Sequence, residues 1–174
     1  MGELSLIHIF TLEGHHPVPY EGRRGIRALL EGMELLLGWQ PIMEGPNIIG
    51  LFDVTGGGAI SLEPGGQFEL SGAQVETVHQ TSSELMAHLA QVREVAQPLH
   101  IGFLGMGMTP SWTLAEMPKM PKGRYKIMTA YMPKVGDVYK RQTTNCSKPT
   151  LTISKAESVC AIRLPSANSL TSTV

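Results

Sequence analysis

Apolar and polar residues alternate on both sides of a Pro-Gly-Gly turn in the middle of the chain. Ile60 and Leu62 alternate with polar residues before the turn, and Phe68 and Leu70 do so after it. Because successive side chains of a strand point to opposite faces, this pattern predicts a β-hairpin with one apolar and one polar face. Proline restricts its own φ and glycine tolerates positive φ, so the chain can reverse within this turn.

The polar face of the predicted hairpin carries Glu63, Gln67 and Glu69. Two carboxylates and an amide on a rigid sheet offer oxygen ligands to a hard divalent cation such as Mg²⁺, which leaves its other positions to water and substrate phosphates. An ordinary solvated outer face gives the same pattern, because amphipathic hairpins normally turn polar residues to water. Both interpretations stay open, with Glu63 and Glu69 as the candidate metal ligands.

Helical spacing of apolar residues predicts a helix within residues 21–37 and a second, long helix that ends at Pro98. Ser71 and Gln74 have the spacing of a capping box at the start of the second helix. Short strands are predicted over residues 6–10, 39–43, 47–54 and 59–63, and a buried central strand over 99–106. Together these elements predict an α+β fold, an antiparallel sheet with helices packed on one side.

Basic residues are concentrated before and inside a predicted helix over residues 124–132. Five of them fall within sixteen positions: Lys119, Lys122, Arg124, Lys126 and Lys134. Basic groups beside a helix start favour phosphate or carboxylate. A solvated basic helix is the alternative, and nucleic-acid binding is disfavoured by the formal net charge of -1 of the whole chain.

The composition favours one ordinary domain. The 174 residues are 42% hydrophobic and 17% charged, and the sequence contains no apolar run of membrane-spanning length and no secretory signal pattern. We therefore expect a cytoplasmic protein without membrane or nucleic-acid partners. Cys146 and Cys160, the only cysteines, form no metal-binding or disulfide pattern, and His15 and His16 are interpreted as solvated loop residues.

The hairpin sequence also carries a family resemblance. The run SLEPGGQFELSG, followed by ETVHQT, is similar to the signature of the plant and proteobacterial type of glutamate-cysteine ligase. The segments PVPYEG, GIRALLEG, MEGPNIIGL, HIGFLGMG and MPKGRYKIM with YMPKVG resemble that family in the same order. The resemblance extends from about residue 11 to residue 136, and it implies part of the glutamine-synthetase-like fold of carboxylate-amine ligases.

The resemblance implies an ATP-dependent reaction. In the family, ATP phosphorylates the γ-carboxylate of glutamate and the amine of cysteine then attacks the acyl phosphate, giving γ-glutamylcysteine, the first intermediate of glutathione synthesis. It implies Mg²⁺ as cofactor, with Glu63 and Glu69 as the metal candidates and Gln67 as their neighbour. It also implies that Lys122 and Arg124 are candidates for holding glutamate carboxylate or nucleotide phosphate, and Gln67 is counted with these substrate-binding or nucleotide-binding residues. No nucleophilic catalytic residue is identified, because positioning and charge neutralisation carry phosphoryl transfer.

Two alternatives stay open beside this function. One is another ATP-dependent carboxylate-amine ligase with a different amine acceptor, and the other is an inactive nucleotide-binding fragment of the fold.

Both ends of the chain differ from the family pattern. The segments SLIHIF and DVYKRQ look like translated sequencing adapters, and the acidic strand that the family places before Thr11 is absent. We expect residues 1–10 to be a non-native extension, residues 11–136 a partial ligase catalytic domain, and residues 137–174 a non-native or disordered tail. A chain of this extent is expected to show no ligase turnover by itself.

Overall fold

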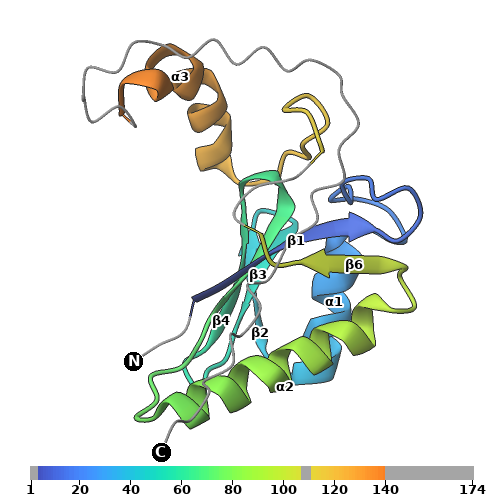
Figure 1. Ribbon diagram of the computed structural model, residues 1–174, viewed down its shortest axis with the longest axis vertical. Coiled ribbons are helices and arrows are strands. Elements are labelled where there is room, and N and C mark those ends of the chain that lie inside the picture. Colours follow the sequence, from blue (N-terminus) through green and yellow to red (C-terminus); the bar gives the residue numbers. More distant parts are fainter. Residues whose placement is uncertain (1–3, 107–110, 140–174) are drawn as a thin grey trace, which may run out of the picture.

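The computed structural model describes residues 4–106 and 111–139, and it shows an antiparallel sheet with three helices (Figure 1). The strands are β1 (Leu4–Thr11), β2 (Gln40–Glu44), β3 (Asn47–Phe52), β4 (Ala59–Glu63), β5 (Gln67–Ser71) and β6 (Ile101–Leu104). The helices are α1 (Ile26–Leu37), α2 (Val78–Ala96) and α3 (Gly123–Tyr139). Within the described residues the sheet order is β2-β3-β4-β5-β1-β6, with every pair antiparallel, which confirms the predicted α+β class.

The predicted hairpin is present as β4 and β5, joined by a short 3₁₀ turn at Pro64–Gly66. Gly65 and Gly66 have φ values of 80° and 79°, which L side chains rarely adopt. A Cβ on Gly66 would also lie 2.7 Å from Cδ1 of Ile26, so this position requires glycine for space as well as for conformation. The turn is therefore pressed against the start of α1.

The apolar face of the hairpin forms the centre of the core. Ile60, Leu62, Phe68 and Leu70 are at most 2% exposed, whereas Glu63, Gln67 and Glu69 are partly exposed on the opposite face, as predicted. Four fully buried residues of α1 extend the same core: Ile26, Leu29, Leu30 and Met33. Each large apolar side chain removed from water contributes about 1.5–3 kcal/mol, so this face determines how the sheet and α1 pack.

Helix α2 packs beside α1, while α3 extends away from both (Figure 1). The ring of His88 on α2 stacks on Phe68 of β5, with the ring centroids 6.0 Å apart. In the view of Figure 1, α3 lies beyond the β4–β5 turn at the opposite end of the molecule from α2. No helix in the described part of the chain is long and apolar enough to cross a membrane.

The predicted capping box at Ser71 and Gln74 is wrong. Ser71 is instead the last residue of β5, where it pairs with Leu4 and Ala59, so it cannot begin a helix. The capping box forms six residues later, because the N–H of Gln80 donates to Oγ1 of Thr77 at 3.2 Å and the N–H of Thr77 donates to Oε1 of Gln80 at 2.9 Å. Two Ser/Thr-x-x-Gln sequences compete here, and strand pairing removes the first one.

The predicted central strand over residues 99–106 is shorter and lies elsewhere in the sheet. Leu99 and His100 belong to the turn after α2, since their N–H groups donate to the carbonyls of Ala96 and Gln97 at 3.1 Å each. The strand β6 begins only at Ile101 and forms an edge of the described sheet, next to β1. An apolar run between Pro and Gly therefore did not distinguish a central strand from an edge strand.

The buried histidine of α2 gives a prediction for stability against pH. Burial lowers the pKa of His88 from 6.5 to about 4. Between these two values the unfolded chain binds a proton that the folded chain excludes, so stability falls as the pH drops below 6.5 and the loss is complete near pH 4. In the unmodified protein, the free energy of unfolding should fall by on the order of 3 kcal/mol between pH 7.5 and pH 4 because of His88. We expect the variant His88→Leu to lack this fall, as measured by urea unfolding at a series of pH values.

The exposed His79 on the same helix supplies the matched control. His79→Leu should keep the pH dependence of the unmodified chain. Identical pH profiles for the unmodified protein and His88→Leu would contradict the assignment.

Candidate functional site

The main-chain carbonyl of Leu62, near the end of β4, joins the hairpin to the start of α3. It accepts a hydrogen bond from Nζ of Lys122 and another, of 3.0 Å, from the hydroxyl of Tyr125. Leu62 is fully buried, Lys122 is 6% exposed and Tyr125 is also 6% exposed. These contacts hold the predicted basic segment against the polar end of the hairpin.

The next residue along β4, Glu63, faces the same basic segment. Its Oε1 accepts a hydrogen bond of 3.1 Å from Nη2 of Arg124 and lies 3.9 Å from Nζ of Lys122. Its Oε2 lies 3.4 Å from the hydroxyl of Tyr125. The structure therefore brings together three of the predicted site residues, Glu63, Lys122 and Arg124. We call them, with Tyr125, the polar cluster.

Tyr125, which the sequence analysis did not identify, organises both cations of the polar cluster. Nζ of Lys122 lies 5.5 Å from the centroid of its ring and Cζ of Arg124 lies 5.0 Å from it. Nη2 of Arg124 also donates to the Tyr125 hydroxyl at 3.2 Å. Cation–π and hydrogen-bond contacts to one aromatic residue fix the relative positions of two charges. The tyrosine inside the MPKGRY sequence was the available signal.

The charges of the polar cluster are not balanced. Burial lowers the pKa of Lys122, and the negative charge of Glu63 opposes that shift. Within the polar cluster, Arg124 and a charged Lys122 face one carboxylate, that of Glu63, while the negative charges of Glu69 and Glu44 act on Lys122 from outside the cluster. The guanidinium side chain of Arg124 is 61% exposed, so its free donors are open to an incoming anion. The arrangement can bind phosphate or carboxylate groups.

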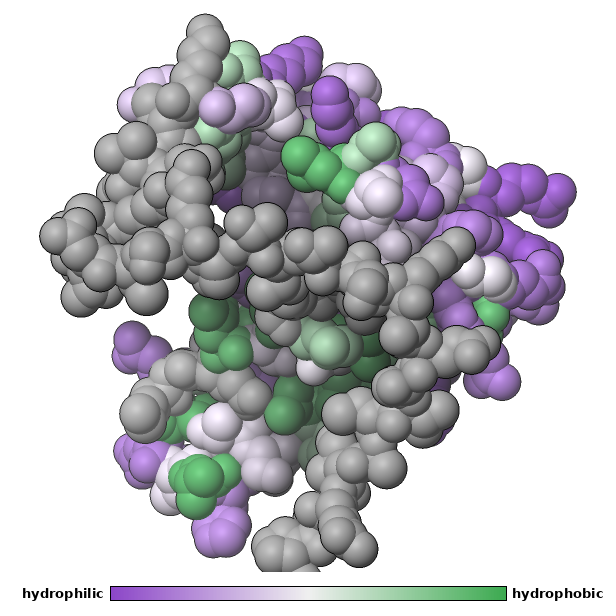
Figure 2. Space-filling model, turned by 45° about the horizontal axis from the view of Figure 1, so that its top comes forward, coloured by the Kyte–Doolittle hydropathy of each residue, from purple (hydrophilic) through white to green (hydrophobic). Residues whose placement is uncertain are grey.

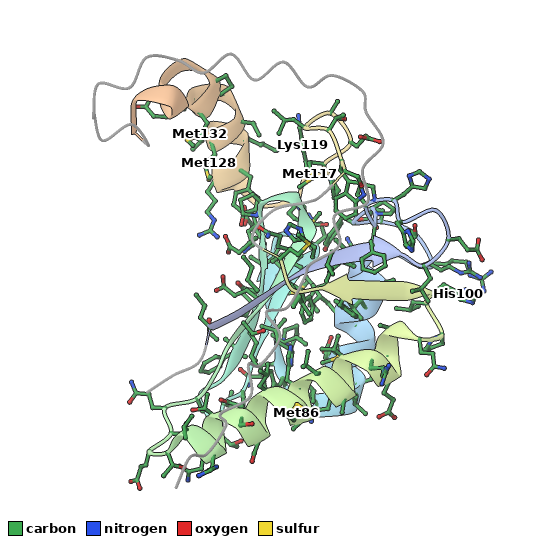
Figure 3. The ribbon with its side chains drawn as sticks, viewed as in Figure 1. Met86, His100, Met117, Lys119, Met128 and Met132 are labelled. Carbon is green, nitrogen blue, oxygen red and sulfur yellow. The ribbon has the colours of Figure 1, made fainter. Side chains whose placement is uncertain are left out.

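A loop covers the hairpin turn and positions Lys122. A Cβ on Gly65 would lie 2.2 Å from Cε of Met117, and a Cβ on Gly66 would lie 3.3 Å from Cε of Met120. Figure 3 shows Met117 and Lys119 on this loop, above the hairpin turn and to the side of α3. At the start of α3, the N–H of Gly123 donates to Oε1 of Glu44 at 2.5 Å. The two glycines therefore serve the close approach of the loop as well as the turn.

The other two predicted site residues lie on the same face but outside the polar cluster. Gln67 pairs with Glu63 across the hairpin, yet its Nε2 lies 2.9 Å from Nε2 of His8 on β1. Glu69 lies opposite Ser61, diagonal to Glu63, and its Oε1 is 3.5 Å from Oγ of Ser71. Diagonal residues of an antiparallel pair are roughly 7–8 Å apart, within reach of two long side chains.

The described residues do not form a closed metal centre. No group of three His, Cys, Asp or Glu side chains with metal-binding geometry occurs among them. Glu63 is already paired with Arg124, whereas no basic nitrogen of the described chain lies within 4.0 Å of a Glu69 carboxylate oxygen. This donor set fits Mg²⁺ that arrives with phosphate better than Mg²⁺ held by protein ligands alone.

Strand β1 places a histidine on the polar face beside the hairpin. His8 is 4% exposed; burial lowers its pKa, and the Met106 backbone opposes this shift. The edge of the Trp112 ring meets the His8 ring, with centroids 6.3 Å apart. A cavity of about 260 Å³ opens here, lined by His8, Phe10, His15, Leu104, Ser111 and Trp112. The sequence analysis predicted the strand but gave His8 no role.

The chain is similar to several curated plant proteins. It is 53% identical over 129 residues to glutamate-cysteine ligase, chloroplastic, of Medicago truncatula, covering 74% of this chain and 24% of that protein. The protein of the same name from Nicotiana tabacum is 55% identical, and the match covers 70% of this chain and 22% of that protein. The one from Arabidopsis thaliana is 51% identical, and the match covers 73% of this chain and 23% of that protein. The chain thus spans about a quarter of the length of these relatives.

The names of these relatives overturn one expectation. All three are chloroplastic proteins, so the prediction of a cytoplasmic protein is wrong. That prediction relied on the lack of a targeting pattern at the first residues. A segment that matches only about a quarter of its relatives carries no information of this kind.

The family comparison covers the hairpin and the polar cluster. The model of glutamate-cysteine ligase family 2 matches residues 7–165, which is most of the chain. The matched range contains β4, β5 and the start of α3, and therefore every residue of the polar cluster. The chain belongs to the glutamate-cysteine ligase family.

Proposed function

We propose that this chain contributes the polar cluster to an ATP-dependent ligase that joins the γ-carboxylate of glutamate to the amine of cysteine. The observation that carries the proposal is the contact of Lys122 and Arg124 with the polar end of the hairpin, within a chain of this family. On this proposal the sheet is part of a glutamine-synthetase-like fold. The product, γ-glutamylcysteine, is the first intermediate of glutathione synthesis.

Arg124 is suited to binding a carboxylate or a phosphate. Its planar guanidinium already holds the Glu63 carboxylate at 3.1 Å and remains largely exposed. A substrate anion would take free donors of the same group, or replace Glu63. Lys122 supplies a second positive charge. Because the Leu62 carbonyl and the Tyr125 ring already hold its side chain in place, no further side-chain entropy is lost when the substrate binds.

The reaction needs positioned charges and no protein nucleophile. Transfer of the γ-phosphoryl group of ATP to the glutamate carboxylate gives ADP and an acyl phosphate. Attack by the cysteine amine then releases phosphate and a proton. Lys122 and Arg124 reduce the repulsion between the phosphate groups and the attacking carboxylate, because positive charges that are already in position cost little reorganisation at the moment of reaction.

We assign Glu69, with Glu63 as a second donor, to Mg²⁺ that accompanies ATP. Mg²⁺ bound by these carboxylates and by phosphate oxygens would neutralise the phosphate charge. Glu69 suits this role because no basic nitrogen of the described residues lies within 4.0 Å of its carboxylate, although its charge still acts on Lys122 from farther away. The runner-up function is a ligase of the same type with another amine acceptor, since the polar cluster contains no group that would recognise a thiol.

The first prediction uses a chimera. Replacing the matching stretch of the Medicago truncatula relative by the 129 aligned residues of this chain should give an enzyme that forms γ-glutamylcysteine from ATP, glutamate and cysteine. Arg124→Gln in that chimera should lower kcat/KM about 100-fold, because the positive charge and the guanidinium donors proposed to bind the substrate anion are lost. Product formation is measured by mass spectrometry, with other amines tested in place of cysteine.

Lys126→Gln is the matched control, because Lys126 lies one helical position beyond Tyr125 and is exposed. It should keep kcat/KM within a factor of about 3. Equal losses in the two variants would contradict a specific role for Arg124. A folded chimera without turnover would contradict the proposed function of this stretch.

The second prediction concerns Mg²⁺. Glu69→Gln keeps the size of the side chain but removes the charge that a hard cation needs, so it should weaken Mg²⁺ binding in the presence of ATP at least about tenfold. Calorimetric titration with Mg²⁺ compares the affinity of Glu69→Gln with that of the unmodified chain. Glu76→Gln serves as the control, because Glu76 is exposed and lies before α2. Equal affinities for the unmodified chain and Glu69→Gln would exclude Glu69 as a ligand.

A further inference from the structure

A second pocket lies at the far side of the molecule from α3. It has a volume of about 250 Å³ and is lined by residues of the loop after β1, the segment before α1 and the turn after α2: Thr11, Glu13, His16, Arg24, Leu99 and His100. Figure 3 shows His100 at this side, well away from Met128 and Met132 on α3. Hydrophilic residues dominate the same side of the surface in Figure 2. We call it the distal pocket.

Two hydrogen bonds close the loop after β1. The N–H of Thr11 donates to the carbonyl of His16 at 2.8 Å, and the N–H of His16 donates to Oγ1 of Thr11 at 3.0 Å. Gly14 has a φ of 72°, and a Cβ there would lie 2.8 Å from the His16 ring. Glycine therefore suits this position both in conformation and in space, and it lets the loop close over His16 to form one wall of the distal pocket.

The opposite wall is fixed at the cost of backbone strain. His100 adopts a φ of 56°, which residues other than glycine rarely do. Its carbonyl accepts a hydrogen bond of 2.9 Å from the N–H of Leu12, and its Nδ1 lies 4.0 Å from Oε1 of Glu13. These contacts connect the turn after α2 to the loop after β1. Strained residues of this kind are enriched at binding sites.

The distal pocket contains an unpaired guanidinium. Arg24 makes no hydrogen bond or ion pair with any residue that the structure describes. Its neighbour in sequence, Arg27, is by contrast bound to Glu21, Pro46 and Asn47. Arg24 can therefore offer its whole donor fork to a ligand, and a carboxylate matches that fork in two parallel hydrogen bonds.

The charges of the distal pocket distinguish between two kinds of ligand. Arg24 and Glu13 place one positive and one negative side chain on its walls, beside the partly buried apolar side chain of Leu99. A simple anion such as phosphate would be attracted by Arg24 and repelled by Glu13. A zwitterion that carries both charges is attracted by both residues, and its apolar part can lie on Leu99.

We propose that the distal pocket binds a free α-amino acid with an apolar side chain. Arg24 holds the carboxylate, Glu13 holds the ammonium group and Leu99 contacts the side chain. The volume of about 250 Å³ is sufficient for a molecule of this size. This site is separate from the polar cluster, so the inference does not depend on the ligase reaction.

The test is a titration of the whole chain with L-leucine, followed by two-dimensional amide and guanidinium NMR spectra. Saturable shifts should appear at Arg24, Leu99 and His100, with those of Glu63 and Arg124 unchanged. N-acetyl-leucine, which lacks the ammonium charge, and leucine amide, which lacks the carboxylate, should each bind at least tenfold more weakly. Inorganic phosphate should not compete.

Paired variants separate the contributions of the two charges. Arg24→Gln should weaken leucine binding at least tenfold but should not weaken the binding of leucine amide, which lacks the carboxylate. Glu13→Gln should also weaken leucine binding at least tenfold but should not weaken the binding of N-acetyl-leucine, which lacks the ammonium group. Arg23→Gln is the matched control, because the adjacent Arg23 does not line the pocket. Shifts confined to the polar cluster, no shifts at all, or equal affinities for leucine and its two derivatives would overturn the proposal.

Discussion

The position of the polar cluster depends on one buried carbonyl, that of Leu62. Pairing between β3 and β4 stops at Ser61, so Leu62 lies past the end of that ladder. Lys122 and Tyr125 both donate to its carbonyl oxygen. A buried carbonyl without a partner costs about 1–3 kcal/mol, so the hairpin favours the arrangement in which α3 begins at this point. The main chain of the hairpin thereby positions the basic side chains.

Electrostatics make the same contact useful for binding. Burying Lys122 costs free energy, as its lowered pKa shows, and the neighbouring Glu63 offsets only part of that cost. Arg124 adds a second positive charge beside Lys122, and its side chain stays open to solvent. A site of this kind attracts anions without a large rearrangement. The contacts of Lys122 and Tyr125 with the Leu62 carbonyl also explain why α3 starts at a defined place, although this helix lies apart from α1 and α2 in Figure 1.

Local patterns predicted those parts of the fold that depend on local sequence. Alternation around Pro64–Gly66 predicted the hairpin, its two faces and the polar positions of Glu63, Gln67 and Glu69. It could not show that Glu63 pairs with Arg124, because that contact spans 61 residues of sequence. The incorrect capping box and the misplaced edge strand have a similar cause. Strand pairing decided the role of Ser71, and the neighbours of β6 depend on β1, which is far away in sequence.

The most direct test of this account is a double-mutant cycle between the hairpin and α3. Unfolding free energies are measured in urea at low salt for the unmodified chain, Glu63→Gln, Arg124→Gln and the double variant. If the polar cluster is one unit, the two substitutions couple by about 0.5–1 kcal/mol, and the coupling falls as salt is added. Additive effects at every salt concentration would show that β4 and α3 do not form a common site.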